Sequence, residues 1–258
     1  MKEYWVVFVG KSVLFRKEEN NSCHLLFEER LPQDIKRSTD VFRFHTSDGK
    51  TINVLQTGEA PENSGYLCTG LRESYYCLSE DEFILAGKSW ELFYWNRHTR
   101  YCGFCGAATL PDTEISKKCP SCGEEYWPLL NVAVICLIYR GEEVLLVRAR
   151  NFRSDFYGLV AGFVETGETL EDALRREVLE ETSIKIKNIR YFDSQPWPYP
   201  CNLMVGFYAE YDSGDLHLQF SELERGGWFH RDHLPNLPQK SSIARRLIDN
   251  WLAKDCTP

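Results

Sequence analysis

One helix in the sequence directs acidic side chains toward the protein interior, and this constrains the fold more than any other feature. A helix is expected from Leu170 onward, because apolar residues recur three and four positions apart and form one stripe. Glu177 and Glu181, four residues apart, fall within this stripe. Glu180 lies on its flank, whereas Asp172 faces away. The stripe consists of Leu170, Ala173, Leu174 and Val178.

Two inward carboxylates need a compensating positive charge. They repel each other, and burying them unpaired would cost several kcal/mol. A bound divalent cation removes both costs, and a site made only of oxygen ligands suits Mg²⁺ or Mn²⁺. We therefore expect Glu177 and Glu181 to bind catalytic Mg²⁺ or Mn²⁺. The alternative, an acidic helix surrounded by water, is disfavoured by their position within the stripe.

Two Cys-x2-Cys pairs predict a second metal site. Cys102 and Cys105 form the first pair, Cys119 and Cys122 the second, and thirteen residues separate the pairs. Four thiolates on tight turns suit tetrahedral Zn²⁺, with Zn–S bonds of about 2.3 Å. A redox dithiol is the main alternative for a single pair, but two pairs at this spacing favour zinc. Because protein fills all four positions, we expect this zinc to be structural.

The composition is that of a globular protein without a membrane span or a basic surface. The chain has 258 residues, of which 43% are hydrophobic, and its net charge is −8. This charge argues against a general nucleic-acid grip but not against recognition of one nucleotide at a chain end. No signal-peptide core or run of about 20 apolar residues is present, so we expect a cytoplasmic protein with reduced thiols. We expect packing or surface roles for Cys23, Cys68, Cys77, Cys136, Cys201 and Cys256.

The N-terminal region has the pattern of a β-rich domain. Up to about residue 78, short apolar runs alternate with polar turns, which predicts strands. Ser79 and Glu82 form a capping-box pattern that predicts a helix to about Thr99. We therefore expect a β-rich N-terminal domain over residues 1–98 that ends in this helix. The strand-like runs are Trp5–Val9, His24–Phe27, Val41–Phe44 and Ile52–Leu55.

The rest of the chain divides into the cysteine segment and an α/β region. We expect a zinc ribbon over residues 99–128 and a catalytic domain over residues 129–258. A last helix is expected over about Ser242–Ala253. The predicted strands of the α/β region are Ala133–Tyr139, Val144–Val147, Leu159–Phe163, Ile189–Phe192 and Leu203–Glu210.

The acidic helix and the segment before it resemble the Nudix box. This resemblance implies an α/β fold, an α/β/α sandwich with a mixed sheet, that hydrolyses a nucleoside diphosphate linked to some group X. One position departs from the pattern, because Ser183 stands where the family has a glycine that ends the helix in a left-handed conformation. Serine there costs about 1 kcal/mol. The matching residues are Gly162, Glu168, Arg176, Glu177, Glu180, Glu181 and Ile184.

A proline-rich segment narrows the substrate. Residues 194–200, Ser-Gln-Pro-Trp-Pro-Tyr-Pro, resemble a signature of the NADH pyrophosphatases, with Tyr199 in place of Phe. The prolines hold the segment extended, so that it can present an aromatic wall to a flat ring. The alternative is a rigid loop at a strand edge. Two other departures are Cys201-Asn202, where the family pair ends in Ser, and Trp127, an indole in place of a Tyr that can still stack on a ring.

The resemblance also implies a set of site residues. Substrate would contact Arg72, Glu114, Trp127, Phe163, Gln195, Pro196, Trp197, Pro198, Tyr199, Pro200, Cys201, Asn202 and Ala244. The catalytic metal would be held by Glu177, Glu181, Glu222 and the Ala161 carbonyl. Glu180 or another glutamate of the box would hold the attacking water or accept its proton, and Arg176 would orient the glutamates.

The implied function is hydrolysis of NADH or NAD to nicotinamide mononucleotide and AMP, with removal of NAD caps from RNA as a related activity. Members of the family are usually homodimers. A Nudix hydrolase of ADP-ribose or another dinucleotide is the nearest alternative. A nucleotide-sensing Nudix regulator is less favoured, because the box carboxylates are all present. A zinc-ribbon adaptor would need a basic ribbon, whereas here only Lys117 and Lys118 oppose the acidic Asp112, Glu114, Glu124 and Glu125.

Overall fold

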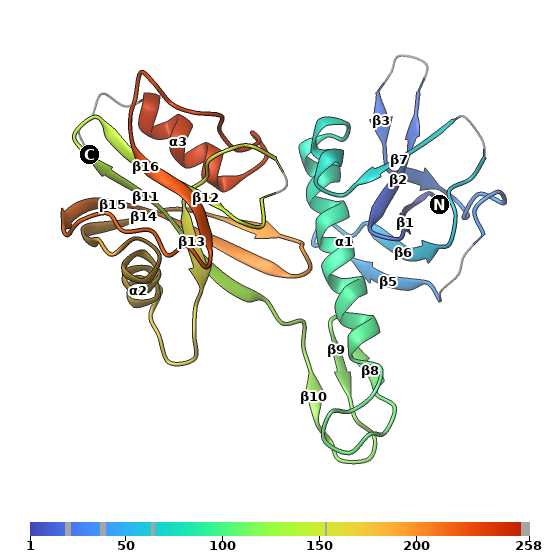
Figure 1. Ribbon diagram of the computed structural model, residues 1–258. Coiled ribbons are helices and arrows are strands. Elements are labelled where there is room, and N and C mark those ends of the chain that lie inside the picture. Colours follow the sequence, from blue (N-terminus) through green and yellow to red (C-terminus); the bar gives the residue numbers. More distant parts are fainter. Residues whose placement is uncertain (19–21, 37–39, 63–64, 153, 254–258) are drawn as a thin grey trace. The chain divides into compact units, whose positions relative to one another are not determined.

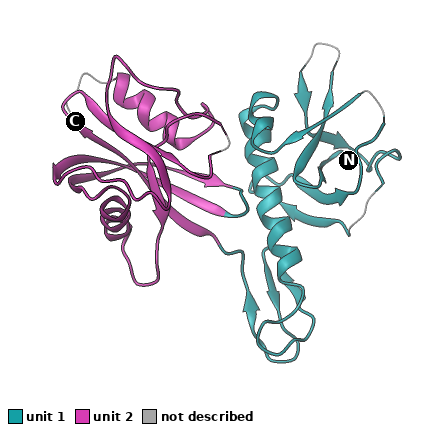
Figure 2. Ribbon diagram, in the orientation of Figure 1, with its two compact units in different colours: residues 1–129, 198–201 teal, residues 130–197, 202–258 magenta. Residues whose placement is uncertain are grey.

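The computed structural model describes residues 1–18, 22–36, 40–62, 65–152 and 154–253. The chain divides into two compact units (Figure 2). Unit 1 comprises residues 1–129 and 198–201, and unit 2 comprises residues 130–197 and 202–258. None of the described helices combines the length and hydropathy that a membrane span requires. Of the six cysteines outside the two pairs, Cys256 lies outside the described residues.

Unit 1 is built on a mixed sheet (Figure 1). Among the described residues seven strands take part, in the order β3-β2-β1-β6-β5, with β4 also paired to β1 and β7 to β2. β1 and β6 run parallel, whereas the other pairs are antiparallel. The strands are β1 (Glu3–Val9), β2 (Ser12–Lys17), β3 (Cys23–His24), β4 (Leu26–Glu28), β5 (Phe42–His45), β6 (Thr51–Thr57) and β7 (Tyr66–Gly70).

Helix α1 (Glu80–His98), which follows the short helix η1 (Glu73–Tyr76), covers one face of this sheet. Alternation along β1 sends Phe8 into the cluster that contains Phe93 of α1, whereas the next side chain, Val7, packs in a second cluster on the other face. The predicted cap is confirmed, since the Ser79 hydroxyl accepts the Glu82 N–H at 3.4 Å. The Glu82 carboxylate also accepts the Leu25 N–H at 2.9 Å, which ties α1 to the sheet.

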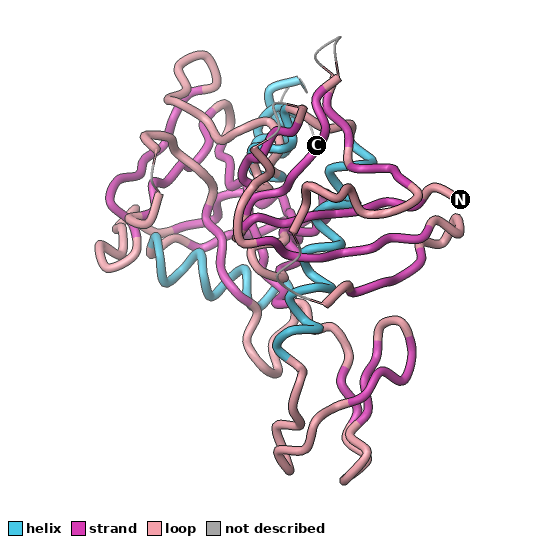
Figure 3. Tube along the Cα trace, turned by 90° about the vertical axis from the view of Figure 1, so that its right-hand side faces the viewer, coloured by secondary structure: helices cyan, strands magenta, loops and turns pink. Residues whose placement is uncertain are grey.

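The cysteine-rich ribbon follows the C-terminal end of α1 (Figure 3). Its strands β8 (Leu110–Thr113), β9 (Ser116–Lys118) and β10 (Glu125–Tyr126) form a small antiparallel sheet in the order β10-β9-β8. Lys117 is buried rather than exposed: its Nζ donates to the carbonyls of Asn96 at 2.6 Å and Thr99 at 3.3 Å. A ribbon lysine therefore satisfies carbonyls at the C-terminus of α1, which the sequence did not reveal.

Unit 2 is a mixed sheet between two helices. Among the described residues six strands take part, in the order β14-β15-β11-β12-β16, with β13 also paired to β11. β11 and β15 are parallel. The elements are β11 (Asn131–Arg140), β12 (Glu143–Ala149), β13 (Val160–Phe163), α2 (Leu170–Thr182), β14 (Lys185–Trp197), β15 (Asn202–Ser213), β16 (Leu223–His230) and α3 (Ile243–Ala253).

The helices α2 and α3 cover opposite faces of this sheet. Alternate residues of β11 divide between the two cores: Val134 packs in the cluster of α2, and Ile135 in the cluster of α3. Leu174 and Leu247 are fully buried members of these two clusters. The expected α/β/α sandwich with a mixed sheet is confirmed.

Several elements differ from the sequence-based expectation. The run His24–Phe27 is interrupted at Leu25 and forms parts of two strands, and the run Ile189–Phe192 is the middle of the longer β14. Strands β2, β7, β8, β9, β10 and β16 have no counterpart among the strands expected from the sequence. β16 contains Gly226, where a Cβ would approach Leu218 and Val147 to 3.1 Å, so close packing of the backbone explains a glycine that obscures the strand pattern.

Candidate active site and zinc site

Helix α2 begins and ends with its own capping residues. The Thr169 hydroxyl accepts the Asp172 N–H at 3.1 Å, which satisfies one of the free amides of the first turn. Ser183 ends the helix with φ 60° and ψ 10° and so takes the left-handed conformation expected there. The α2 segment therefore has the backbone that the sequence pattern predicts, although a serine occupies the position that favours glycine.

The side chains of α2 are distributed as the helical periodicity predicts. Ala173, Leu174 and Val178 are fully buried. Glu181 is 6% exposed within the same stripe, and the Glu177 side chain is 14% exposed. By contrast, the side chains of Glu180, Asp172 and Arg175 are at least half exposed. Two carboxylates therefore lie on the inward side of the helix.

Arg176 holds the other acidic side chains in place. Its guanidinium forms a bidentate pair with Glu168, with Nε–Oε1 at 2.6 Å and Nη2–Oε2 at 2.9 Å. Nη1 donates to Glu177 at 2.9 Å and to Glu180 at 3.2 Å, and Nη2 donates to the Phe163 carbonyl at 3.0 Å. These salt bridges are the contacts through which the sequence expects Arg176 to orient the glutamates. The Arg176 hydrogen bonds lower the pKa of Glu168 to about 2.

Gly162 provides the space for Glu177. A Cβ at position 162 would lie well inside van der Waals contact with the carboxylate carbon and both oxygens of Glu177. The glycine in β13 is therefore required by the close approach of a side chain, not by its backbone angles. Ala161, the predicted carbonyl ligand, precedes it on the same strand and is half-buried.

The segment before β16 connects Glu222 to the end of α2. The N–H of His217 donates to the Thr182 carbonyl at 3.0 Å, and the N–H of Gln219 donates to the Glu181 carbonyl at 2.8 Å. These bonds satisfy carbonyls that the last turn of α2 leaves without helical partners. Glu222 follows on an exposed turn, and its charge contributes to the raised pKa of both Glu177 and Glu181.

The electrostatics of this cluster fit a divalent cation. Burial, followed by the charges of Glu177, Glu222 and Glu180, raises the pKa of Glu181 to about 8. No described residue donates a hydrogen bond to the Glu181 carboxylate. Burial also raises the pKa of Glu177, although Arg176 opposes the shift. The Glu181 carboxylate thus lacks a positive partner among the described residues, and carboxylate oxygens are the donors that Mg²⁺ and Mn²⁺ prefer.

The described carboxylates do not bring three ligand atoms together as closely as the cysteines of the zinc site do. Within the described ranges, only the four cysteines bring three or more ligand atoms within 4.8 Å of one another. Such spacing agrees with Mg²⁺ chemistry, because this ion keeps several water or phosphate ligands and needs few protein ligands. The residues therefore fit a cation that substrate and water help to bind.

Of the other predicted site residues in unit 2, Gln195 uses both polar atoms of its side chain to hydrogen-bond with backbone groups. Its Nε2 donates to the Ser241 carbonyl at 2.8 Å, and its Oε1 accepts the Ile243 N–H at 2.6 Å. These bonds fix the start of α3, which carries the buried Ala244. Asn202 is buried at the start of β15, and its Oδ1 accepts a bond from Asn131 at 3.1 Å. Phe163 is 56% exposed, and Pro196 and Trp197 end β14.

The remaining predicted substrate residues lie in unit 1. Tyr199 packs against the N-terminal core, and the Arg72 guanidinium lies 4.8 Å from its ring centroid. Pro198 is buried against α1, where a Cβ at Gly87 would approach it to 3.2 Å. Pro200 and Cys201, both half-buried, complete this segment of unit 1.

Glu114 and Trp127 occupy different surroundings in the ribbon part of unit 1. The Glu114 carboxylate accepts the His45 N–H at 3.0 Å and pairs with His45 Nδ1 at 2.5 Å. The ribbon is thereby joined to β5. Trp127, which follows β10, is 50% exposed.

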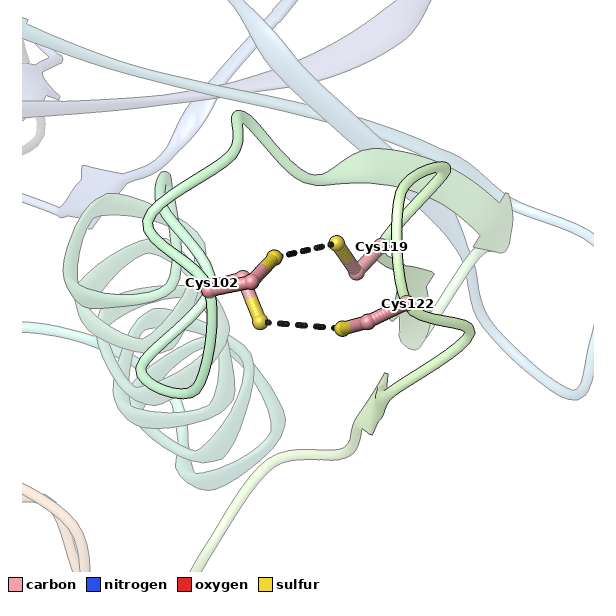
Figure 4. Close-up of side chains that lie close together, drawn as sticks. Cys102, Cys119 and Cys122 are labelled. Atoms are coloured by element: carbon pink, nitrogen blue, oxygen red, sulfur yellow. Dashed lines mark hydrogen bonds between the residues drawn. The ribbon is translucent and has the colours of Figure 1, made fainter.

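The four cysteines of the two Cys-x2-Cys pairs form the zinc site that the sequence predicts (Figure 4). Their sulfur atoms point toward one another, with Cys102 3.6 Å from Cys122 and Cys105 3.4 Å from Cys119. A tetrahedral Zn²⁺ with bonds of about 2.3 Å would set its thiolates roughly 3.8 Å apart. The site fits structural zinc.

The two knuckles share one backbone design. Gly106 N–H donates to the Cys102 carbonyl at 2.9 Å, and Gly123 N–H donates to the Cys119 carbonyl at 3.0 Å. Both glycines have positive φ, 77° and 83°. The hydrogen bond from the Tyr126 hydroxyl, followed by backbone N–H groups, lowers the pKa of Cys102 to about 6 and favours the thiolate.

Comparison with known proteins agrees with this description. Three family models match the chain: the NUDIX domain over residues 129–251, the NADH pyrophosphatase zinc ribbon domain over residues 97–127, and the NADH pyrophosphatase-like rudimentary NUDIX domain over residues 2–95. The last match gives the N-terminal region a family likeness that the sequence reasoning missed. A NUDIX hydrolase crystal structure from Nitrosomonas europaea superposes with a TM-score of 0.50 at 23% identity, over 59% of this chain and 90% of that one. That likeness concerns the fold alone.

Two relatives cover most of the chain. The NAD-capped RNA hydrolase NudC of Pseudomonas aeruginosa is 42% identical over 207 residues, which are 80% of this chain and 74% of that protein. The NAD-capped RNA hydrolase NudC of Pectobacterium carotovorum is 45% identical over 210 residues, 78% of this chain and 80% of that protein. The fold of unit 2 and its helix of inward glutamates define a Nudix hydrolase. Within that class, the chain belongs to the family of the NudC proteins.

Proposed function

We propose that this chain hydrolyses the pyrophosphate bond of NADH and NAD, giving nicotinamide mononucleotide and AMP, and that it removes NAD caps from RNA. The observation that carries the proposal is the buried Glu181 carboxylate beside Glu177 and Glu222, which no described residue neutralises. The names of the relatives from Pseudomonas aeruginosa and Pectobacterium carotovorum, NAD-capped RNA hydrolase, support the substrate class.

The proposed ligands of Mg²⁺ or Mn²⁺ are Glu177, Glu181, Glu222 and the carbonyl of Ala161. Such an ion, when bound, neutralises charge on the phosphoryl oxygens and lowers the pKa of a coordinated water. Glu177 is held ready for this role by the Arg176 hydrogen bond at 2.9 Å and by the space above Gly162. These contacts fix one ligand before substrate arrives.

Glu180 is the proposed acceptor of the water proton. Its side chain is 54% exposed and reaches Arg176 at 3.2 Å, so it is oriented but still open to solvent. A carboxylate in that position holds the attacking water and accepts its proton as the phosphoanhydride bond breaks. The leaving AMP or nicotinamide mononucleotide carries the new negative charge.

We further propose that Phe163 and the indole of Trp197 contact a ring of the dinucleotide. Phe163 exposes more than half of its surface immediately after Gly162. Gln195 acts indirectly, because it fixes the start of α3 and thereby Ala244. A homodimer, which rests on the family resemblance, and a cytoplasmic location, which rests on the sequence pattern, complete the proposal.

The test is chromatographic analysis of NADH after incubation with Mg²⁺ or Mn²⁺. The native chain should give AMP and reduced nicotinamide mononucleotide, and Glu181→Gln should be slower by at least about a hundredfold. Glu171→Gln is the matched control, because Glu171 lies on the exposed side of α2. Faster cleavage of ADP-ribose than of NADH and NAD-capped RNA would favour the nearest alternative. Metal-dependent binding of NADH without cleavage would indicate a sensor.

A further inference from the structure

A cavity in unit 1 is lined by several positively charged side chains. It lies at the C-terminal end of α1, against the zinc ribbon, and its volume is about 720 Å³. This volume is in the range of small-molecule sites. Its lining consists of Asp40, Phe93, Asn96, Arg97, Arg100, Tyr101, Ala108, Thr109, Pro111 and Lys117.

The charge of this lining contrasts with that of the whole protein. Three cations, Arg97, Arg100 and Lys117, line the cavity beside one carboxylate, Asp40, whereas the chain as a whole carries −8. Such a concentration of one charge in a concave surface attracts an ion of the opposite sign. The ligand expected from charge is therefore an anion.

Lys117 makes the end of α1 compatible with an anion. Free carbonyls at a helix C-terminus carry partial negative charge and would repel a phosphate. Here the Lys117 ammonium neutralises this partial charge, because it donates hydrogen bonds to the carbonyls of Asn96 at 2.6 Å and Thr99 at 3.3 Å. The two arginines are not needed for that purpose.

The arginines differ in how far the protein already engages them. Arg97 donates to Gln56 Oε1 at 2.5 Å and lies 5.7 Å from the centre of the Phe93 ring. Among the described residues, none forms a hydrogen bond or ion pair with the Arg100 guanidinium. A guanidinium fork matches the oxygens of a phosphate and binds them in pairs. Beside it Tyr101, 67% exposed, offers an aromatic face.

We propose that this cavity binds a phosphate monoester of mononucleotide size, with Arg100 and Arg97 on the phosphate and Tyr101 against the base. A small anion fits better than a long nucleic acid. A polynucleotide needs a track of cations along its backbone, whereas the acidic chain gathers these three at a single cavity. None of the lining residues is among the predicted substrate or metal residues of the hydrolase, so the cavity is proposed as an additional site.

The experiment is calorimetric titration of the zinc-loaded full chain with AMP, without added Mg²⁺ or Mn²⁺. Omitting these ions keeps phosphate from binding at the glutamate cluster. The native chain should bind one AMP, and Arg100→Gln should bind about tenfold more weakly, the loss of one charge-assisted contact. Lys118→Gln is the matched control: Lys118 is a neighbouring ribbon cation that pairs with Glu125 at 3.0 Å outside the lining. It should bind AMP like the native chain.

Other probes separate the sources of binding. Adenosine should bind at least tenfold more weakly than AMP, because it lacks the phosphate, and equal affinity would overturn the proposal. The proposal would also be overturned if a short RNA without a terminal phosphate bound through Arg100 and AMP did not bind. Thermal unfolding and zinc content should match between Arg100→Gln and the native chain, which shows that the fold is intact. AMP affinity unchanged by Arg100→Gln refutes the site, and Glu181→Gln, which tests the hydrolase, should leave metal-free AMP binding unchanged.

Discussion

Replacement of Gly162 by alanine tests how the active site positions its glutamate. The new methyl group would overlap the Glu177 carboxylate, and normal carbon contacts of 3.5–4.0 Å require a shift of about 1.5 Å. A displacement of this size costs roughly a hundredfold in rate, or about 2.7 kcal/mol. The fold should lose only about 1 kcal/mol, because alanine suits a strand better than glycine and partly offsets the strain. We expect kcat/KM for NADH to fall about a hundredfold while the midpoint of thermal unfolding changes by a few degrees.

The matched control is Gly227→Ala in the same sheet. A Cβ at position 227 would meet only Phe229, at 3.9 Å, an ordinary contact. Its kcat/KM should stay within about twofold of the native value. A Mg²⁺ titration adds a second reading, since Gly162→Ala should raise the concentration of Mg²⁺ needed for half-maximal rate. If Gly162→Ala hydrolyses NADH at the native rate and at the same Mg²⁺ concentration, the assigned position of Glu177 is wrong.

Three further predictions concern stability. Ser183→Gly should raise the free energy of unfolding by about 1 kcal/mol in urea denaturation, because Ser183 has φ 60°; a loss would contradict the left-handed cap. Burial raises the pKa of Glu91 to about 7 from 4.5, so the stability due to its neutral form is complete below pH 4.5 and is lost as the pH rises through 7. The free energy of unfolding of Glu91→Gln should therefore exceed that of the native chain by up to about 2 kcal/mol at pH 8 and equal it at low pH. A difference in unfolding free energy that does not change with pH would refute this. Removal of zinc, or Cys122→Ser, should lower the unfolding midpoint of unit 1 by roughly 5–10 °C, measured with zinc content, and an unchanged midpoint would show that zinc does not stabilise the unit.

The sequence was most informative where a periodic pattern and a chemical conflict coincided. On α2, the apolar spacing indicates which side faces inward, and a bound divalent cation explains why carboxylates lie on that side. The cysteine spacing was equally direct, because four thiolates in two tight turns leave little freedom. In both cases residues close in sequence determine the arrangement, so local geometry was sufficient.

Contacts between distant segments could not be read in the same way. The sequence pattern predicts a surface charge of the ribbon at Lys117, whereas the side chain is buried against carbonyls at the end of α1. The motif predicts that Tyr199 forms part of an aromatic wall, whereas the structure places its ring beside Arg72 in the N-terminal core. The same motif predicts that Gln195 contacts substrate, whereas its side chain hydrogen-bonds at the start of α3 with residues more than forty positions away. Such pairings depend on tertiary packing, which no short pattern encodes.

The path of the chain through the two units limits how the protein can be divided. Residues 198–201 belong to unit 1, although the strands on both sides of them belong to unit 2. A fragment that begins at residue 130 would keep this segment but lose its packing partners, and would expose the buried Pro198 to water. A fragment that ends at residue 129 would leave the surface that Pro198 covers on α1 open. Dividing the chain between residues 129 and 130 therefore gives no fragment that keeps all its packing contacts. Insertions or deletions in residues 198–201 should affect both units.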